Sequence, residues 1–352
     1  MIIIMNSGVT DEQVDAVVNK IRSFGLGTNI SRGTERTVIG AIGDERKLEP
    51  EMFDTLPGVE YSMHIVKQYK IVSRESHKHD SVINIGGARG APGVALGGNQ
   101  IQVIGGPCSV ETQQQMDLAA QQVADAGCRL MRGGAFKPRT SPYTFQGKGE
   151  EGLAIFRKAA DKYNLPIVTE LMDARMLDAF LEHDVDVIQI GTRSMQNFEL
   201  LKEVGRTNKP VILKRGMSAT ISEWLMAAEY IAAGGNHNII FCERGIRSFE
   251  TAYRNVMDVT CIPVLKKETH LPVIVDPSHA GGKAWMVAAL SQAAVAAGAD
   301  GLLVEMHPNP CEAWCDADQA DTENNNFLKL RLHHLALLPS PLPQREKPCD
   351  SS

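Results

Sequence analysis

The sequence is poor in aromatic side chains, carries no excess of positive charge and contains no long hydrophobic run. Aromatic residues make up 5% of its 352 residues, and the formal net charge is −6 at pH 7. Nucleic acid is not expected as a partner, because a chain of this charge has no dominant basic face. The apolar opening at residues 1–5 is too short for a membrane span or a signal segment, so we expect neither a membrane partner nor export from the cytoplasm.

The sequence also lacks the cysteine pattern of a disulfide-rich protein. Its seven cysteines are an odd number spread over a long chain, whereas disulfide frameworks are typical of short secreted chains. This pattern favours a reducing, cytoplasmic location. The 43% hydrophobic and 22% charged content is ordinary for a globular protein. The length predicts one large domain with a small one, or two of medium size.

Residues 1–70 predict a small α+β domain. The expected elements are a strand at residues 1–5, a helix at 11–24, strands at 28–31 and 37–42, a helix at 49–55 and a strand at 61–66. This order, βαββαβ, is that of a ferredoxin-like domain. No catalytic grouping is visible in it, so a regulatory role and a packing or oligomerising role are equally compatible with the pattern.

The rest of the chain predicts a TIM barrel. Residues 71–100 are rich in glycine and are expected to form a linker with a hairpin. Eight apolar runs then alternate with helical stretches such as 113–126, 155–163, 222–233 and 285–297; the runs begin at Ile101, Cys128, Leu165, Val185, Pro210, Asn238, Leu271 and Gly301. This alternation is typical of a (β/α)8 barrel, here at 101–337. A doubly wound sheet is the alternative, and the lack of a suitably placed G-x-G-x-x-G disfavours it. The proline-rich tail at 338–352 is expected to be disordered.

Polar residues follow all eight expected strands, on the face where barrel active sites lie. Six of them are cations from the second, fourth, fifth and sixth strands: Arg132, Lys137, Arg139, Arg193, Lys214 and Arg244. Pro138 fixes the backbone between Lys137 and Arg139. Six converging cations repel one another unless anions lie between them, so the set suits two phosphate or carboxylate groups. Singly, each would be read as a surface salt bridge, and Lys214 as a Schiff-base lysine.

A second set of side chains follows the first, seventh and eighth expected strands, which become neighbours when a barrel closes. Its members are Cys108, His279, Glu305 and, further downstream, Asp316. A thiolate, an imidazole and two carboxylates suit a divalent transition metal and are too soft a set for Mg²⁺ or Ca²⁺. His307 is a competing ligand and Cys311 and Cys315 lie nearby, while a buried cysteine by itself is usually packing.

These residues lie in motifs that resemble the type I 3-deoxy-D-arabino-heptulosonate 7-phosphate (DAHP) synthases. The motifs are GGPCSVET, MRGGAFKPRTSPYTFQG, IQIGTRSMQNFELL, LKRGM, CERGIRSFE, VDPSHAGG and VEMHPNP, and they cover nearly every strand end between about residues 100 and 330. The N-terminal domain resembles the ferredoxin-like regulatory domain of microbial forms under feedback control. The resemblance implies an enzyme of the shikimate pathway to aromatic amino acids, an aromatic amino acid as effector, and a homotetramer.

The resemblance also implies roles for individual residues. Cys108, His279, Glu305 and Asp316 match the metal ligands, with Asp318 as an alternative to Asp316 and the metal left open among Mn²⁺, Fe²⁺, Co²⁺ and Zn²⁺. Phosphoenolpyruvate is held by residues matching Arg132, Lys137, Arg193, Lys214 and Arg244. The segment Lys137-Pro138-Arg139-Thr140 matches the one that receives the phosphate of erythrose 4-phosphate, whereas the sister octulosonate phosphate synthase usually has Lys-Ala-Asn-Arg-Ser there.

The chemistry of that reaction accounts for both sets. Carbon 3 of phosphoenolpyruvate is a weak nucleophile, so the aldehyde must be activated by a Lewis acid held by ligands such as His279. Lys137, between the substrates, is the expected acid for the aldehyde oxygen, and Glu170 is expected either to manage the attacking water or to orient Lys214. Three alternatives remain: an octulosonate phosphate synthase using arabinose 5-phosphate, a Schiff-base aldolase using Lys214, and a catalytically silent regulatory binding protein.

Overall fold

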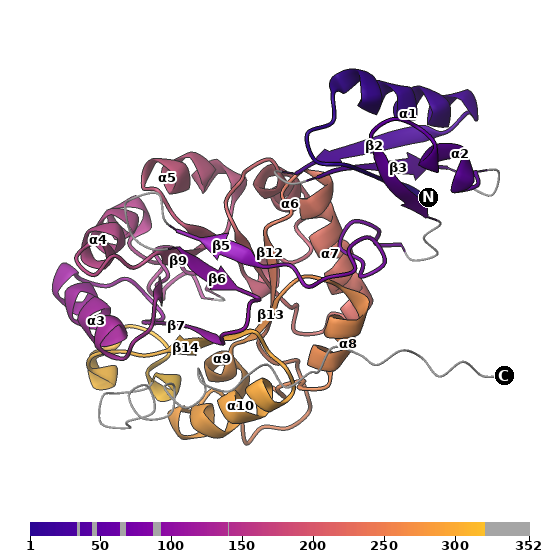
Figure 1. Cartoon of the computed structure of the whole chain (residues 1–352). Helices are drawn as coiled ribbons and strands as arrows, with labels where there is room; N and C mark the ends of the chain where they lie inside the picture. The colour runs from indigo at the N-terminus through magenta and orange to yellow at the C-terminus, as the bar shows by residue number, and fades with distance from the viewer. Residues whose placement is uncertain (34–35, 44–47, 64–67, 87–92, 140, 321–352) are drawn as a thin grey trace.

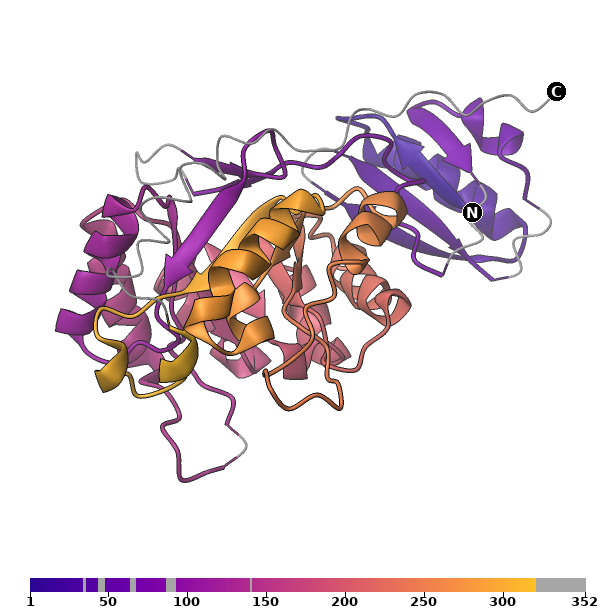
Figure 2. The same cartoon turned by 90° about the horizontal axis from the view of Figure 1, so that it is seen from below.

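The computed structural model describes the chain except for residues 34–35, 44–47, 64–67, 87–92, 140 and 321–352. A small N-terminal unit lies beside a large barrel ringed by helices (Figure 1). The two units also lie side by side in the view turned by 90° (Figure 2). In the part of the chain that the structure describes, no helix has both the length and the apolar character needed to cross a membrane.

The N-terminal unit confirms the predicted ferredoxin-like order. Its elements are β1 (Ile2–Met5), α1 (Asp11–Ser23), β2 (Gly27–Arg32), β3 (Thr37–Ile42), α2 (Glu51–Asp54) and β4 (Val59–Met63). The strands form one antiparallel sheet in the order β2-β3-β1-β4. Helix α2 is shorter than expected, and β4 starts two residues early because Gly58 turns the chain with a φ of +85° just before Val59.

Helix α1 covers one face of this sheet. Thr10 caps the helix, and its side chain and that of Gln13 satisfy each other's backbone N–H groups. Val14, Val17 and Ile21 lie on one face of the helix and are buried among the side chains of the sheet. Each such side chain contributes about 1.5–3 kcal/mol when fully buried, so this stripe, rather than helix propensity, holds α1 in place.

The opposite face of the sheet is directed toward the barrel. Ile2, Ile4 and Val38 form its buried centre. The hydroxyl of Ser31 on β2 donates to the carbonyl of Ala232 at 2.7 Å and lies 2.7 Å from His237 Nε2. These contacts join β2 to the end of helix α7 (Ile221–Ala233), so the unit is docked by both apolar and polar contacts.

Eight parallel strands close into the predicted barrel. They are β7 (Gln102–Gly106), β8 (Leu130–Arg132), β9 (Ile167–Leu171), β10 (Val187–Ile190), β11 (Val211–Lys214), β12 (Ile239–Glu243), β13 (Val273–Val275) and β14 (Gly301–Glu305). Strand β14 pairs with β7 and completes the ring. Its outer helices are α3 (Gln113–Asp125), α4 (Gly149–Asp161), α5 (Leu177–Glu182), α6 (Phe198–Gly205), α7, α8 (Cys261–Glu268) and α10 (Ala284–Ala296). A short helix, α9 (Pro277–Gly281), follows β13 directly.

Helix α4 begins at Gly149 rather than at the predicted 155. Its first turn was not predicted because it contains two glycines, which have low helix propensity. One of them, Gly152, is buried where a Cβ would come within 3.2 Å of Ala135, so packing outweighs propensity there. The expected closing region of the barrel after residue 320 and the tail at 338–352 lie outside the described residues.

A hairpin of β5 (Ile83–Ile85) and β6 (Val94–Leu96) lies across one end of the barrel (Figure 1). Ile83, Ile85, Val94 and Leu96 are buried against a layer of strand residues: Ile104, Leu130, Val168, Val187, Ile212, Ile240, Cys242, Ile274 and Leu303. Arg129, which immediately precedes β8, donates to the carbonyl of Gly93 at 3.0 Å. The hairpin therefore seals the amino end of the strands with apolar side chains.

Candidate active site

A cavity of about 420 Å³ opens at the carboxyl end of the barrel strands. Nine of the residues expected at a site line it: Lys137, Pro138, Arg139, Glu170, Arg193, Lys214, Arg244, His279 and Asp316. Met217, Arg247, Arg254 and Asn255 line it as well and were not expected. Thr140 lies outside the described residues. The concentration of cations supports an anionic ligand at this end of the barrel.

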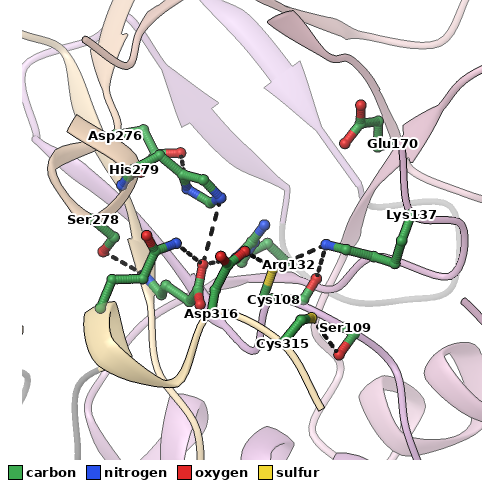
Figure 3. A network of polar contacts seen from close by, with 12 residues as sticks. Cys108, Ser109, Arg132, Lys137, Glu170, Asp276, Ser278, His279, Cys315 and Asp316 are labelled. Atoms are coloured by element: carbon green, nitrogen blue, oxygen red, sulfur yellow. Dashed lines mark hydrogen bonds and ion pairs between the residues drawn. The ribbon is translucent and has the colours of Figure 1, made fainter. Parts of the chain in front are cut away.

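Cys108, His279, Glu305 and Asp316 form a possible metal-binding cluster beside this cavity, which His279 and Asp316 also line. Figure 3 shows Cys108, His279 and Asp316 close together. One ligand atom from each lies within 4.8 Å of all the others. Glu305 ends β14, Cys108 follows β7 by two residues, and His279 lies in α9 just after β13. Neighbouring strands thus bring together residues that are almost two hundred positions apart in the sequence.

The local chemistry of the cluster fits a cation. Glu305 is 1% exposed, and its Oε1 has no hydrogen-bond partner among the described residues. Burial, and then the neighbouring Cys108, raise the pKa of Glu305 well above its usual range. A buried carboxylate oxygen left without a partner is costly. With sulfur, nitrogen and oxygen donors around it, a divalent transition metal would satisfy that oxygen.

Two alternative ligands are engaged elsewhere. His307 Nε2 lies 3.3 Å from the carboxylate of Glu111, and His307 Nδ1 accepts from the N–H of Asn309 at 3.1 Å. Asp318 forms an exposed ion pair with Lys283 at 2.8 Å. The geometry therefore favours Asp316 over Asp318 as the fourth member of the cluster.

Asp316 reaches the cluster through an uncommon backbone conformation. Its φ is +55°, in the left-handed region that aspartate tolerates better than most residues. The thiol of Cys108 donates to Asp316 Oδ2 at 3.0 Å. Burial opposes the charge of Asp316, but this hydrogen bond and the nearby His279 lower its pKa to about 2. Contact with Cys315, together with burial, raises the pKa of the Cys108 thiol to about 12, so binding a metal there requires loss of that proton.

The loop that carries Asp316 is held by Glu111, a buried residue that the sequence did not single out. One carboxylate oxygen of Glu111 accepts from the Ser109 hydroxyl and from the backbone N–H of Trp314, both at 2.9 Å. The other faces His307. Glu111 thus ties the residues after β7 to the residues just before Asp316.

The cations and the possible metal ligands, expected as two separate sets, are interlocked. Arg132 Nη1 lies 3.2 Å from Glu305 Oε2. Lys137 Nζ donates to the backbone carbonyl of Cys108 at 2.8 Å and lies 2.9 Å from its sulfur (Figure 3). Burial alone would lower the pKa of Lys137, but the neighbouring Cys108 and Cys315 raise it above its ordinary value. Lys137 is therefore protonated at neutral pH.

Asp276 provides a third link between the two sets. It follows β13 directly, caps the start of α9 and is 1% exposed. Its Oδ2 lies 2.5 Å from Lys214 Nζ and 2.8 Å from His279 Nδ1. Burial by itself raises the pKa of Asp276, yet His279 and Lys214 hold it well below its usual range, so Asp276 is ionised. Lys214 is therefore held by Asp276, and Glu170 lines the same cavity.

Arg244 and Glu170 both line the cavity. Arg244 Nη1 is buried without a hydrogen-bond partner among the described residues, and burial lowers the pKa of Arg244. Glu170 Oε2 lies 3.4 Å from Gln189 Nε2. A Cβ at position 191 would lie 1.8 Å from Glu170 Oε1, so Gly191 is needed for that carboxylate to lie where it does. An anion at Arg244 would satisfy the buried guanidinium.

Sequence reasoning missed several of these residues for different reasons. Asp276 stood at an expected strand end, in the motif VDPSH, but was not distinguished from its neighbours. Glu111 was likewise visible in GGPCSVET without any sign that it is buried. Arg247, Arg254 and Asn255 lie in an irregular loop after β12, where no periodic pattern indicates which side chains turn inward.

Comparison with known proteins gives the same picture over nearly the whole chain. Residues 72–331 match the DAHP synthetase I family, and residues 1–67 match the DAHP synthase ferredoxin-like domain. The chain belongs to the DAHP synthetase I family. This confirms the resemblance seen in the motifs and the barrel with its ferredoxin-like domain.

Individual relatives differ in how much of the chain they match. The phospho-2-dehydro-3-deoxyheptonate aldolase of Thermotoga maritima is 48% identical over 320 residues, which cover 91% of this chain and 93% of that protein. The crystal structure of that aldolase (DAHP synthase) from Thermotoga maritima superposes with a TM-score of 0.73 at 46% identity, covering 95% of this chain and 96% of the other. The 2-dehydro-3-deoxyphosphooctonate aldolase of Syntrophotalea carbinolica is 35% identical over 243 residues, covering 63% of this chain and 86% of that protein.

Proposed function

We propose that this chain is a DAHP synthase, which condenses phosphoenolpyruvate with erythrose 4-phosphate to give DAHP and phosphate. The observation that carries the proposal is the interlocked mouth of the barrel, where a cationic cavity directly adjoins the possible metal-binding cluster. The match to the Thermotoga maritima aldolase over 91% of the chain supports it. The enzyme would act in the cytoplasm, in the shikimate pathway to the aromatic amino acids.

Phosphoenolpyruvate would occupy the cationic part of the cavity. Its phosphate and carboxylate would be held by Arg132, Lys137, Arg193, Lys214 and Arg244. The buried guanidinium of Arg244 supports this placement, since an anion would give it the partner it lacks among the described residues. The same cations would stabilise the charge that gathers on the leaving phosphate.

Erythrose 4-phosphate would enter beside the segment that runs from Lys137 to Thr140. Pro138 and Arg139 line the cavity, and Arg139 Nε donates to the carbonyl of Phe145 at 3.1 Å. This bond directs the guanidinium across its own loop, which leaves its remaining N–H groups for a phosphate. The pair Pro138-Arg139 supports the four-carbon sugar over arabinose 5-phosphate.

Cys108, His279, Glu305 and Asp316 would hold one divalent transition metal ion, drawn from Mn²⁺, Fe²⁺, Co²⁺ and Zn²⁺. When bound, the ion supplies Lewis-acid polarisation of the aldehyde oxygen. Lys137 Nζ, 2.9 Å from the Cys108 sulfur, lies at the border between the cluster and the cavity. A protonated Lys137 is therefore placed to donate a proton to that oxygen.

The reaction balances with residues at this site. Carbon 3 of phosphoenolpyruvate forms a bond to the aldehyde carbon, and Lys137 gives its proton to the aldehyde oxygen. Water adds to carbon 2, with Glu170 as the group that accepts its proton. The carbon 2–oxygen bond to phosphate then breaks, and the carbon 2 hydroxyl gives its proton to the departing phosphate as it becomes the keto group of DAHP. The proton held by Glu170 balances the one that Lys137 gave up, so both groups can return to their starting states.

The N-terminal unit would carry regulation. Its match to the DAHP synthase ferredoxin-like domain supports a regulatory role, with an aromatic amino acid as effector and a homotetramer as the assembled form. Removal of about the first seventy residues should leave turnover and abolish inhibition by phenylalanine or tyrosine. Inhibition that persists in the truncated protein would contradict this role.

The substrate assignment is tested by competition between the two sugars. Manganese-loaded protein is incubated with phosphoenolpyruvate and equal amounts of erythrose 4-phosphate and arabinose 5-phosphate, and the products are separated by mass. We expect the seven-carbon product to dominate. A dominant eight-carbon product would favour the octulosonate phosphate synthase instead, and a borohydride-trapped adduct at Lys214 would favour a Schiff-base aldolase.

A further inference from the structure

Asp276 stands between two groups that the proposed function uses for different purposes. Its Oδ2 is shared by Lys214 Nζ, at 2.5 Å, and His279 Nδ1, at 2.8 Å. Its Oδ1 accepts from the backbone N–H of His279 at 2.9 Å and so fixes the start of α9. The His279 ring is not angled to complete a hydrogen bond to Oδ2, and its Nδ1 has no hydrogen-bond partner among the described residues.

The position of Asp276 leaves it few other partners. It is 1% exposed, and Figure 3 shows it beside the imidazole of His279, on the side away from Asp316. His279 Nε2 lies 3.6 Å from Glu305 Oε2, so this nitrogen faces the cluster while Nδ1 faces Asp276. Carboxylates behind a ligating histidine orient the ring and raise its basicity.

We propose that Asp276 is a positioning residue that couples metal binding to phosphoenolpyruvate binding. The proposal rests on the proposed function, because it takes His279 as a metal ligand and Lys214 as a ligand of phosphoenolpyruvate. One carboxylate oxygen that is shared by two neighbours holds each of them less strongly than it would hold one alone. When the cluster draws His279 Nδ1–H toward Oδ2, the hold of Asp276 on Lys214 weakens, and Lys214 becomes available to the substrate.

Reciprocity follows from thermodynamic linkage. If the metal strengthens phosphoenolpyruvate binding by some factor, phosphoenolpyruvate must strengthen metal binding by the same factor. Direct attraction between the metal and an anionic substrate contributes to this factor as well. Replacing Asp276 should remove only the part of the coupling between metal and phosphoenolpyruvate that depends on Asp276.

The barrel contains a matched pair that serves as a control. Asp300, just before β14, pairs with Lys266 at 2.5 Å and is 6% exposed. Its other oxygen accepts from the backbone N–H of Val273 at 2.7 Å. It is thus also a buried aspartate that holds a lysine and a backbone N–H, but it lies at the amino end of the strands. Asp300→Asn should perturb folding in a similar way without touching the site.

The first experiment measures metal affinity alone. Full-length apoprotein is titrated with Mn²⁺ against a chromophoric chelator, for the original sequence, Asp276→Asn and Asp300→Asn, each checked for folding by circular dichroism. We expect Asp276→Asn to weaken Mn²⁺ binding about 10–100-fold, as loss of a partner behind a ligand usually does, and Asp300→Asn to leave it unchanged. Equal affinity in Asp276→Asn and the original sequence would overturn the positioning role.

The second experiment measures coupling. The phosphoenolpyruvate Kd is determined with and without saturating Mn²⁺ by calorimetry in the same three proteins. Couplings of this kind are typically about 5–150-fold, and we expect the ratio of the two Kd values to fall at least fivefold in Asp276→Asn and to persist in Asp300→Asn. An undiminished ratio in Asp276→Asn would overturn the proposal. A lack of phosphoenolpyruvate binding in all three proteins would instead contradict the proposed function.

Lys214→Met provides an independent reading should Asp276→Asn fail to fold. Arg244→Met is its control, because it also removes one cation from the cavity and Arg244 has a guanidinium nitrogen without a hydrogen-bond partner among the described residues. With Lys214 gone, Asp276 serves His279 alone. We expect Lys214→Met to tighten Mn²⁺ binding severalfold more than Arg244→Met. Equal shifts in the two variants would contradict the link through Asp276.

Discussion

The two ends of the barrel are built by the same eight strands and have opposite chemistry. At the amino end, the hairpin of β5 and β6 places Ile83, Ile85, Val94 and Leu96 against inward-facing aliphatic side chains. At the carboxyl end, charged residues at the strand ends and in the loops that follow surround a cavity of about 420 Å³. Aliphatic residues fill the middle of most strands, and polar or charged residues stand at or shortly after their carboxyl ends. Stability and chemistry are therefore carried by different parts of the same barrel.

Buried ion pairs occur at both ends and make the contrast sharper. The amino-end pair of Lys266 and Asp300 has its second carboxylate oxygen occupied by a backbone N–H. At the carboxyl end, the carboxylate of Glu305 keeps one oxygen without a partner among the described residues. A satisfied buried pair is a structural element, whereas an unsatisfied one indicates a place for a ligand.

The largest expected effect comes from a cysteine at the carboxyl end. Cys108→Ser removes the only sulfur donor of the possible metal-binding cluster, and we expect kcat to fall about 10³-fold, because a Lewis acid contributes several kcal/mol to such a step. Bound metal, measured by mass spectrometry, should fall with it. Cys128→Ser, just before β8 and buried in the core, is the control: it should lose some stability and keep both activity and metal. Full activity in Cys108→Ser would contradict the cluster.

The next effect belongs to the amino end. Leu96 is fully buried in the hairpin, so Leu96→Ala should lower the free energy of unfolding by about 2–5 kcal/mol, as other buried leucine truncations do. Urea unfolding measures this change, and kcat should stay within about twofold because the hairpin does not reach the cavity. Val82→Ala, at a site that is 46% exposed, should change stability by less than about 0.5 kcal/mol. A large loss of kcat in Leu96→Ala would show that the two ends are not independent.

A smaller effect is expected where backbone and side chain meet at the cavity. Gly191→Ala places a methyl group on the Glu170 carboxylate, which must move by about an ångström, and such displacements cost up to about 10²-fold in rate. Gly105→Ala is the control, because its nearest neighbour would lie at an ordinary 3.5 Å. Steady-state kinetics should show a lower kcat for Gly191→Ala alone. Equal kcat values for the two variants would contradict a role for Glu170 in the reaction.

The smallest expected effect is a loss of stability at low pH that arises at the amino end of the barrel. His270, before β13, is hydrogen-bonded to Ser81 at 2.7 Å, and burial lowers the pKa of His270 to about 3 from an ordinary 6.5. His270 is therefore neutral in the folded protein. Its contribution to the free energy of unfolding is complete above pH 6.5 and is lost as the pH falls toward 3. At pH 5 this loss is about 2 kcal/mol. Urea unfolding at pH 7.5 and pH 5 should show that difference, and His270→Gln should reduce it; an unchanged difference would exclude His270 as its source.

The sequence predicted the repeated strands of the barrel better than the side chains that contact two functional groups at once. All eight barrel strands were expected from their apolar runs, and the cations and the possible metal ligands from the residues that end them. Asp276 was overlooked because the value of a shared carboxylate depends on which two side chains it meets, and sequence order does not give that. The start of α4 was missed because Gly152 packs where propensity argues against a helix.

The hairpin shows the same limit at the other end. Its two strands were expected within a glycine-rich linker, but their position across the barrel was not, since three-residue strands carry no signal about the surface they cover. The roles of individual residues around the cavity depend on distances of about 3 Å, the length of a hydrogen bond, between segments far apart in the chain. Such proximity arises only once the ring of strands has closed.

The most direct test of the central claim follows the loss of phosphoenolpyruvate by its ultraviolet absorbance. The full-length protein is given erythrose 4-phosphate before EDTA treatment, after it, and after Mn²⁺ is restored, with Cys108→Ser run in parallel. We expect loss of absorbance that EDTA abolishes and Mn²⁺ restores in the original sequence, and neither loss nor restoration in Cys108→Ser. An absorbance that stays constant in the Mn²⁺-loaded original protein would contradict the assignment of the carboxyl end to this chemistry.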